Sequence, residues 1–327
     1  MKAEDRFVEK LRGLLPDCGR VLIGPGDDAA LIAGRPGSLA ATTDLLLEGT
    51  DFLPNEDPEQ IGRRALSVNL SDLAAIGARP EFFLLSIAYA PEKGSDYALA
   101  IVRGAISQAV RFGACLVGGD LSHASGTVVS VALWGEPAGE PLLRSGARPG
   151  DVLWLSGYPG RAAAGLRLAQ ERSEPVRLLP QDEELLAAYR DPVPRVGLGV
   201  WLAREGAARA AIDVSDGLGI DSGRLARASG VRAVIERDRI PVSPALAAFA
   251  RRESADPFDW ILAGGDDYEL LFAASENEAV RLAPPRPEWE IFVTPIGYFE
   301  KGEGAVLRDR KGDRDISELG YDHLEKA

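Results

Sequence analysis

Aspartate recurs along this chain in short segments that are rich in glycine, serine or threonine and flanked by apolar runs. Such runs predict buried strands or helices, so each aspartate is expected in or beside a turn or helix end at the margin of a core. A carboxylate there is costly unless a cation meets it. If the segments converge, they form a site for a hard divalent metal ion, which takes oxygen ligands and bridges phosphates. The segments are GPGDDAAL (24–31), TTDLLLEGTDF (42–52), VNLSDLAAIG (68–77), VGGDLSH (117–123) and AIDVSDGLGID (211–221).

Length and composition predict an ordinary soluble, globular protein. The chain has 327 residues, which favours about two domains, and it is 46% hydrophobic and 27% charged. Its formal net charge of −13 argues against nucleic acid or an anionic membrane surface as the main partner. Small phosphate compounds remain compatible with this charge, because bound metal ions can invert it locally.

The two cysteines, Cys18 and Cys115, form no CxxC pair. We therefore expect neither a disulfide framework nor a thiolate zinc site, and a reducing compartment fits best. The first fifteen residues are charged and amphipathic rather than typical of a signal peptide, and no apolar run approaches the roughly 18 residues of a membrane helix. These features predict a cytoplasmic protein without a membrane partner.

Strands and helices are expected to mix without strict alternation, which indicates an α+β fold in two domains, 1–143 and 144–327. The stretch 136–151 is rich in glycine and proline and provides the boundary. Pro58 opens a predicted helix over 58–77 that Gly77 ends, and Ser95 is expected to cap a helix over 95–112. The main strands are predicted at 39–43, 82–89, 115–117, 127–134, 152–156, 210–214, 231–236, 268–274 and 290–297.

Three other patterns carry less weight. GPGDDA fits a dinucleotide-binding fingerprint, but no helix can follow it before Gly34 and Pro36, and its two acids would repel phosphate. No lysine lies in a GxxxxGK[ST] loop, which excludes a Walker-type nucleotide site. The segment SGYPGRAAAG (156–165) could wrap a phosphate at a helix start, although such turns are commonplace. The two histidines, His123 and His323, are too few for a histidine metal cluster.

Taken singly, Asp44 or Asp216 could be a turn or N-cap residue with no further role. Asp72 is harder to explain in this way, because it would give an otherwise apolar helix a polar edge together with Asn69. The doubled acid Asp266–Asp267 adjoins a strongly apolar strand, and turn geometry alone does not explain it. Together the acids favour a shared site.

The motif set resembles that of the thiamine-monophosphate kinases. It comprises GPGDDAAL, TTDLLLEGTDF, NLSDLAAIGARP, GGDLS, RSGARPGD, AIDVSDGL and AGGDDYELLF, in the order of that family and over nearly the whole chain. The family belongs with aminoimidazole ribonucleotide synthetase, selenophosphate synthetase and the hydrogenase-maturation carbamoyl dehydratase. The resemblance implies an N-terminal α+β domain that binds ATP and magnesium and dimerises through its sheet, a C-terminal α+β domain, and a homodimer.

The resemblance also implies roles for individual residues, transferred position by position. Several Mg²⁺ ions would be held by Asp28, Thr43, Asp44, Asp72, Asp120, Asp213 and Asp216. ATP, the co-substrate, would contact Gly119, Asp120, Arg144 and Ser215. Thiamine monophosphate would contact Asp51, Asp266 and Tyr321. Two positions depart from the family, which often has His in place of Asp51 and usually Glu in place of Asp266.

The implied reaction converts ATP and thiamine monophosphate to ADP and thiamine diphosphate. The attacking phosphate has a second pKa of about 6, so it is already anionic at neutral pH and needs no general base. We therefore expect no catalytic acid or base, direct in-line transfer, and Arg144 as a possible stabiliser of charge on the transferring oxygens. The cationic thiazolium ring suits Asp51, Asp266 and the face of Tyr321.

Two alternatives stay open. The first is another ATP-dependent member of the superfamily. Selenophosphate synthetase fits poorly because Cys18 does not lie in a glycine-rich loop, and the carbamoyl dehydratase fits poorly because this chain ends in YDHLEKA without a cysteine. The second is a non-catalytic protein that uses the acids only to bind metal or nucleotide.

Overall fold

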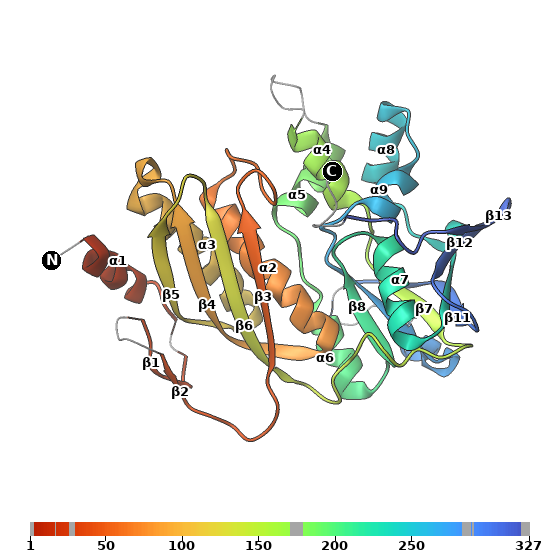
Figure 1. Cartoon of the computed structure of the whole chain (residues 1–327), viewed down its shortest axis with the longest axis horizontal. Coiled ribbons are helices and arrows are strands. Elements are labelled where there is room, and N and C mark those ends of the chain that lie inside the picture. The colour runs from red at the N-terminus through yellow and green to blue at the C-terminus, as the bar shows by residue number, and fades with distance from the viewer. Residues whose placement is uncertain are drawn as a thin grey trace. The chain divides into compact units, whose positions relative to one another are not determined.

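The computed structural model describes residues 3–16, 18–25, 30–170, 179–282, 289 and 291–321, with the side chains of residues 3–6 left aside. The chain forms two compact units. Unit 1 comprises residues 1–73 and 79–137, and unit 2 comprises residues 74–78 and 138–327. Both mix helices with strands, as the expected α+β fold requires (Figure 1).

Unit 1 is built on a four-stranded sheet in the order β3-β6-β4-β5. Strands β3 and β6 pair antiparallel, whereas β4 and β5 pair parallel. A separate two-stranded ribbon precedes the sheet in the chain. The bounds are α1 Ala3–Arg12, β1 Val21–Ile23, β2 Leu31–Ile32, β3 Ala40–Leu47, α2 Pro58–Ile76, β4 Ala78–Tyr89, α3 Gly94–Phe112, β5 Cys115–His123 and β6 Val128–Pro137.

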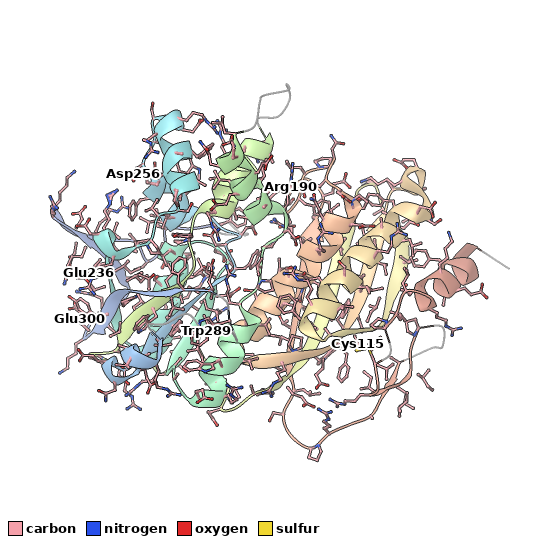
Figure 2. All side chains as sticks on the ribbon, turned by 180° about the vertical axis from the view of Figure 1, so that it is seen from behind. Cys115, Arg190, Glu236, Asp256, Trp289 and Glu300 are labelled. Atoms are coloured by element: carbon pink, nitrogen blue, oxygen red, sulfur yellow. A yellow bond between two sulfur atoms is a disulfide. The ribbon has the colours of Figure 1, made fainter. Side chains whose placement is uncertain are left out.

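Helices α2 and α3 cover one face of this sheet, as the views from the two sides show (Figures 1 and 2). The helices can approach closely because glycines lie between them: a Cβ atom at Gly62 would lie 1.9 Å from the carbonyl oxygen of Ile101. The predicted helix over 58–77 is confirmed, with Gly77 in a left-handed conformation at φ 74°. The expected Ser95 cap is wrong, because α3 begins at Gly94 and its N-cap, Lys93, makes no side-chain capping bond.

The other face of the sheet is less covered. Side chains that point toward the helices, such as Val129 and Val131, are fully buried, whereas Leu45 and Leu47 of β3 are 55% and 38% exposed. A cavity of about 990 Å³ lies over this face. Its lining includes Phe82, Leu84, Trp134, Arg20, Ser86 and Asp120.

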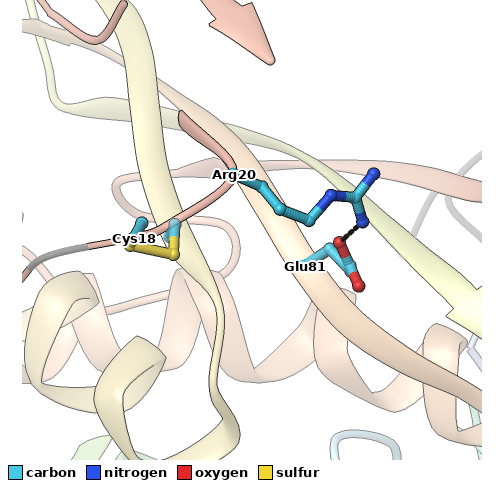
Figure 3. Close-up of a disulfide and its surroundings, with 4 residues drawn as sticks. Cys18, Arg20 and Glu81 are labelled. Carbon is cyan, nitrogen blue, oxygen red and sulfur yellow. Dashed lines mark hydrogen bonds and ion pairs between the residues drawn. A yellow bond between two sulfur atoms is a disulfide. The ribbon is translucent and has the colours of Figure 1, made fainter. Parts of the chain in front are cut away.

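Cys18 and Cys115 form a disulfide, so the prediction that a disulfide is absent was wrong. Their Cα atoms lie 6.3 Å apart although 97 positions separate them in sequence. Next to the disulfide, Arg20 pairs with Glu81 (Figure 3). Arg20 also lies 2.8 Å from Glu136. Sequence spacing could not reveal the bond, because it is the pairing of β5 within the sheet that brings residue 115 to the N-terminal segment. The argument for a reducing compartment from unpaired cysteines therefore no longer holds.

Unit 2 contains a seven-stranded sheet in the order β13-β12-β9-β11-β7-β10-β8. All neighbours pair antiparallel except β12 and β9. The strands are β7 Val152–Ser156, β8 Ala210–Val214, β9 Arg232–Glu236, β10 Glu269–Ala274, β11 Val293–Glu300, β12 Ala305–Asp309 and β13 Gly312–Asp315. The bounds of β7 and β8 are those predicted from the sequence, and the β12–β13 pair was not predicted.

The helices of unit 2 pack their apolar residues against the sheet in a continuous core. Leu155, Ile212, Leu271 and Phe299 are among the strand residues with at most 1% of their surface exposed. The helices are α4 Arg161–Gln170, α5 Pro180–Arg190, α6 Val196–Glu205, α7 Leu218–Ser229, α8 Pro244–Glu253, α9 Pro257–Ala263 and α10 Ala279–Leu282. Within the described ranges, no helix is long and apolar enough to cross a membrane.

Candidate functional site

In unit 1, two of the predicted metal-binding acids lie on the helix-covered side of the sheet. Asp44 of β3 pairs directly with the buried Val131 of β6, so it shares that face. Two residues earlier on the same face, the Thr42 hydroxyl donates a hydrogen bond to the carboxylate of Asp72 on α2. The strand and the helix thus place Asp44 and Asp72 on the same side of the sheet, where Thr42 is hydrogen-bonded to Asp72.

Thr43 occupies the opposite face of β3, and its hydroxyl donates to the carbonyl oxygen of Val131 at 2.8 Å. Thr42 is therefore the threonine that meets the carboxylate of Asp72, and it was not among the residues predicted from the sequence. The two adjacent threonines at 42 and 43 indicated that one of them could meet an acid. Which of the two faces the helices depends on the register of β3 in the sheet, which the sequence does not give.

Gly119 and Asp120 lie inside strand β5, where they pair with Leu85 and Ser86 of β4. The carboxylate of Asp120 is exposed and lines the cavity over the open face. The expectation that each aspartate lies in or beside a turn or helix end is thus wrong for Asp44 and Asp120, which are strand residues. Pairing with β6 and with β4 outweighed the turn preference of aspartate at these two positions.

Asp51 follows β3 in a tight loop, where its Oδ2 accepts a hydrogen bond from the Leu47 backbone at 2.7 Å. The same loop is held by Glu48, which accepts hydrogen bonds from Lys93 at 2.8 Å and from the Thr127 backbone at 2.7 Å. Asp51 therefore has a structural task in shaping its own loop. The remaining predicted ligand of this half, Asp28, lies outside the described residues.

In unit 2, the DVSDG segment forms the end of β8 and the turn after it. Asp213 is 4% exposed within the strand. The Oδ2 atom of Asp221 accepts hydrogen bonds from the backbone of Ser215 at 3.1 Å and of Asp216 at 3.0 Å, which fixes the turn. Burial raises the pKa of Asp221 to about 6, because the charged carboxylate loses hydration.

Arg224 joins the two acids at this turn. Its Nη1 atom contacts the carboxylate of Asp216 and lies 2.7 Å from Oδ1 of Asp221. Burial alone would lower the pKa of Arg224, but the two carboxylates outweigh it and raise that pKa. The guanidinium of Arg224 thus meets the carboxylate of Asp216, so the chain itself supplies a cation to this acid.

The GGDDY segment is hydrogen-bonded onto the same turn. The backbone N–H of Asp266 donates to the Ser215 carbonyl at 2.7 Å, and that of Tyr268 donates to the Val214 carbonyl at 2.8 Å. A Cβ atom at Gly265 would lie 2.5 Å from the Ser215 carbonyl oxygen, so this close approach needs glycine.

A third segment reaches this turn through Tyr321, whose backbone N–H donates to the Asp216 carbonyl at 2.9 Å. Four predicted site residues from three distant parts of the sequence therefore meet at one end of β8. They are Ser215, Asp216, Asp266 and Tyr321.

The second acid of the doubled pair has a different role. Asp267 accepts hydrogen bonds from the backbone of Gly160 at 2.5 Å and of Ala162 at 3.3 Å, so it caps the start of α4. Burial raises the pKa of Asp267 to about 7. The Asp267 carboxylate thus occupies the start of α4, where segment 156–165 was considered as a phosphate-binding loop.

Arg144 is exposed, and its backbone is anchored beside the start of β8. Its carbonyl oxygen accepts a hydrogen bond from Ser229 Oγ at 3.0 Å, and the neighbouring Leu143 carbonyl accepts one from Ala211 at 2.9 Å. Ser215 lies beyond the other end of the same strand. The structure therefore anchors these two predicted nucleotide contacts at opposite ends of β8.

The donor atoms at these positions fit Mg²⁺, which prefers carboxylate and hydroxyl oxygens to nitrogen or sulfur. In unit 1 the set is Asp44, Asp72 and Thr42, and in unit 2 it is Asp213 and Asp216. Within either unit, the part of the chain that the structure describes holds no group of three or more His, Cys, Asp or Glu side chains that could bind a metal ion.

Three further residues of the unit 2 turn were missed from sequence. Asp221 and Arg224 have the i, i+3 spacing of a helical ion pair, which was a usable signal. Tyr268, which donates to Asp266, gave no signal, because an aromatic residue beside an apolar strand predicts only core packing.

Family models match both halves of the chain. The AIR synthase related protein N-terminal domain matches residues 26–136, and the corresponding C-terminal domain matches residues 148–309. A thiamine-monophosphate kinase of Caulobacter vibrioides is 38% identical over 91% of this chain and 84% of its own length. The chain belongs to the thiamine-monophosphate kinase family. The family member of Salmonella typhimurium is 36% identical over 98% of this chain and 96% of its own length.

Solved structures agree with this assignment. A thiamine-monophosphate kinase from Stenotrophomonas maltophilia superposes with a TM-score of 0.85 at 36% identity, covering 93% of this chain and 96% of that one. AaThiL complexed with AMPPCP and TMP superposes with a TM-score of 0.79 at 30% identity, covering 98% and 96%. The hydrogenase maturation protein HypE shares the fold at 19% identity, with a TM-score of 0.78.

Proposed function

We propose that this protein transfers the γ-phosphoryl group of ATP to thiamine monophosphate, giving ADP and thiamine diphosphate, in a reaction that depends on Mg²⁺. The observation that carries the proposal is the meeting of Ser215, Asp216, Asp266 and Tyr321 at the end of β8. These residues combine expected nucleotide, metal and substrate contacts in one place. The relative complexed with AMPPCP and TMP supports the choice of both substrates.

The proposed magnesium ligands are the seven residues named from sequence, together with Thr42. Bound Mg²⁺ would neutralise the charge of the phosphate groups and hold them in place. The chain contributes pre-positioned oxygen atoms: Asp72 is fixed by Thr42, and Asp216 is fixed by Arg224. The proposed ligands of the original set are Asp28, Thr43, Asp44, Asp72, Asp120, Asp213 and Asp216.

The proposed nucleotide contacts are Gly119, Asp120, Arg144 and Ser215, with Arg144 as the source of positive charge for the transferring oxygens. The proposed contacts of the thiazolium ring are Asp51, Asp266 and Tyr321. Tyr321 is 43% exposed, and an aromatic ring is a suitable neighbour for a cationic ligand. Of these three residues Asp51 has the least support as a substrate contact, because its carboxylate already accepts a hydrogen bond from the Leu47 backbone.

The proposed transfer is in-line and direct, without a phosphoenzyme. The attacking phosphate oxygen is anionic at neutral pH, so the chain has to position and neutralise it rather than remove a proton. Quenching a reaction with γ-labelled ATP during turnover should leave no label on the protein. Acid- or base-stable label on a side chain would refute direct transfer.

We also propose that residues 1–143 act as the ATP-binding and dimerisation domain, that residues 144–327 act as the second domain, and that two chains pair through the sheet of unit 1. The half-exposed Leu45 and Leu47 on its less covered face support this, because apolar strand residues are usually buried. Light scattering of the purified protein should give twice the chain mass of 34.9 kDa. Leu45→Asp should shift this value toward the monomer.

The deciding experiment is an assay of the purified protein with ATP, thiamine monophosphate and Mg²⁺. Thiamine diphosphate should form, and a chelator should abolish its formation. Binding of both compounds without turnover would instead indicate a non-catalytic sensor, and turnover of another phosphate acceptor would indicate a different superfamily activity.

Since the reaction consumes ATP, the proposed compartment is the cytoplasm. Thiol labelling of rapidly quenched cells would show whether Cys18 and Cys115 are bonded there.

A further inference from the structure

Two non-glycine residues near the end of β8 have left-handed backbone conformations. Asp266 has φ 69° and Tyr268 has φ 51°, and the only other non-glycine residue with positive φ in the described chain is Ser254, at the C-cap of α8. Aspartate tolerates this region moderately well, whereas a bulky aromatic residue is rarely found there. Backbone conformations of this kind persist where surrounding contacts enforce them, and they cluster at functional sites.

The enforcing contacts are present. The backbone N–H groups of Asp266 and Tyr268 donate to the carbonyls of Ser215 and Val214, so the segment follows the end of β8 closely. The conformation turns the Tyr268 side chain back toward Asp266, where its hydroxyl donates to Oδ1 at 2.8 Å. Tyr268 is 8% exposed, so the hydrogen bond forms in a mostly dry environment where it is stronger than in water.

We infer that Tyr268 is a positioning residue for the cationic ring of the substrate. It acts through Asp266, whose carboxylate it holds in one orientation beside the Ser215–Asp216 turn. A carboxylate fixed in advance loses no side-chain freedom when a cation binds, and this improves affinity for the cation. The inference rests on the proposed function, since it assigns the thiazolium of thiamine monophosphate as the group that Asp266 meets.

The hydrogen bond from the Tyr268 hydroxyl to Asp266 could instead serve only to pair a buried polar group, and removing it would then have a different consequence. In that case its loss would change stability, or would affect every ligand of the site alike. A positioning role predicts a loss that is confined to ligands carrying the positive ring. The two roles can therefore be separated by comparing a cationic ligand with a neutral one of the same shape.

The test uses Tyr268→Phe, which keeps the ring and its packing, and Asp266→Asn. Calorimetric titration would measure binding of thiamine monophosphate, of an analogue whose thiazolium is replaced by a neutral ring, and of a non-hydrolysable ATP analogue. The matched control is Tyr298→Phe, which removes another hydroxyl of unit 2, the one that contacts Arg308. Thermal unfolding of each variant would report any general structural damage.

We expect Tyr268→Phe to weaken binding of thiamine monophosphate about ten-fold, the size typical of one lost hydrogen bond to a charged group. Binding of the neutral analogue and of the ATP analogue should stay at the wild-type value. The variant that combines Tyr268→Phe with Asp266→Asn should bind thiamine monophosphate as weakly as Asp266→Asn alone. Equal weakening for the cationic and neutral ligands, or no weakening of either, would overturn the inference. If the wild-type protein binds thiamine monophosphate no better than the neutral analogue, the cation assignment fails as well. Absence of any thiamine monophosphate turnover in the wild type would overturn the proposed function itself.

Discussion

Arg195 and Glu269 form a two-pronged ion pair in the interior of unit 2. The Nε atom of Arg195 lies 2.6 Å from Oε2 of Glu269, and its Nη2 atom lies 2.6 Å from Oε1. The Glu269 side chain is 1% exposed, and it also accepts a hydrogen bond from the Ser156 hydroxyl at 2.5 Å. Burial alone would lower the pKa of Arg195, but Glu269 outweighs it and raises that pKa. The pair adjoins Asp267, so it supports the segment that carries Asp266.

Breaking this pair should destabilise the protein strongly. Glu269→Gln leaves the guanidinium of Arg195 buried without its counter-charge, and we expect a loss of about 3–5 kcal/mol in the free energy of unfolding. Urea denaturation followed by circular dichroism would measure it. The matched control is Asp313→Asn, which breaks the exposed two-pronged pair with Arg308 and should change stability very little. Equal effects of the two substitutions would contradict the assigned importance of the buried pair.

The stability of unit 2 should depend on pH through Asp267. Its pKa is about 7 in the folded protein against an ordinary value of 3.8, so the folded state retains a proton that the unfolded state releases in this window. Raising the pH from about 4 to about 7 should therefore lower the free energy of unfolding. Asp267→Asn keeps an acceptor for the Gly160 backbone, and it should remove this decrease in the free energy of unfolding between about pH 4 and about pH 7. Parallel pH curves for the two proteins would show that Asp267 titrates normally.

Reduction of the Cys18–Cys115 disulfide should also lower stability. The bond closes a long loop, since 97 positions separate the two cysteines, and removing it frees the unfolded chain. We expect a loss of about 2–4 kcal/mol in the free energy of unfolding on adding reductant. Cys18→Ser should show the same loss without reductant and no further change with it. A reductant effect that persists in Cys18→Ser would have to come from elsewhere.

Asp72 should be required for turnover but not for folding. Asp72→Asn keeps an acceptor for the Thr42 hydroxyl while removing the charge proposed to hold Mg²⁺. We expect kcat to fall by at least about 100-fold, with an unfolding temperature close to that of the wild type. Asp96→Asn provides the control, because that exposed acid pairs only with Lys10 at 3.5 Å among the contacts described for it. Near-normal turnover by Asp72→Asn at low Mg²⁺ would count against the metal model.

Elements with strong local signals were predictable from the sequence. The helix that begins at Pro58 and ends before Gly77, and the strand Ala210–Val214, were both found with nearly correct ends. Their apolar spacing and terminal residues agree with the tertiary structure, so local and global preferences coincide. Asp44 and Asp120 show the opposite case, because aspartate favours turns locally while sheet pairing places these two residues in strands.

The candidate site was only partly predictable for a related reason. The residues that meet at the end of β8 could be named individually, but their meeting depends on backbone hydrogen bonds between segments far apart in sequence. The partners that fix them, Tyr268 for Asp266 and Arg224 for Asp216, are recognisable only once the backbone conformation is known. The roles proposed for these residues are those that the family resemblance implies, and the hydrogen bonds of Tyr268 and Arg224 hold the side chains concerned in place.

The order of strands in unit 1 bears on how the protein is made. The disulfide closes a loop that contains β3 and β4 and ends at Cys115, the first residue of β5, whereas β6 lies beyond Cys115 in the chain and inserts between β3 and β4. Both cysteines therefore leave the ribosome before the strand that completes the sheet. A bond formed at that moment would join the N-terminal segment to β5 while the central position of the sheet is still empty. β6 would then be the last strand added, entering between neighbours that are already covalently confined.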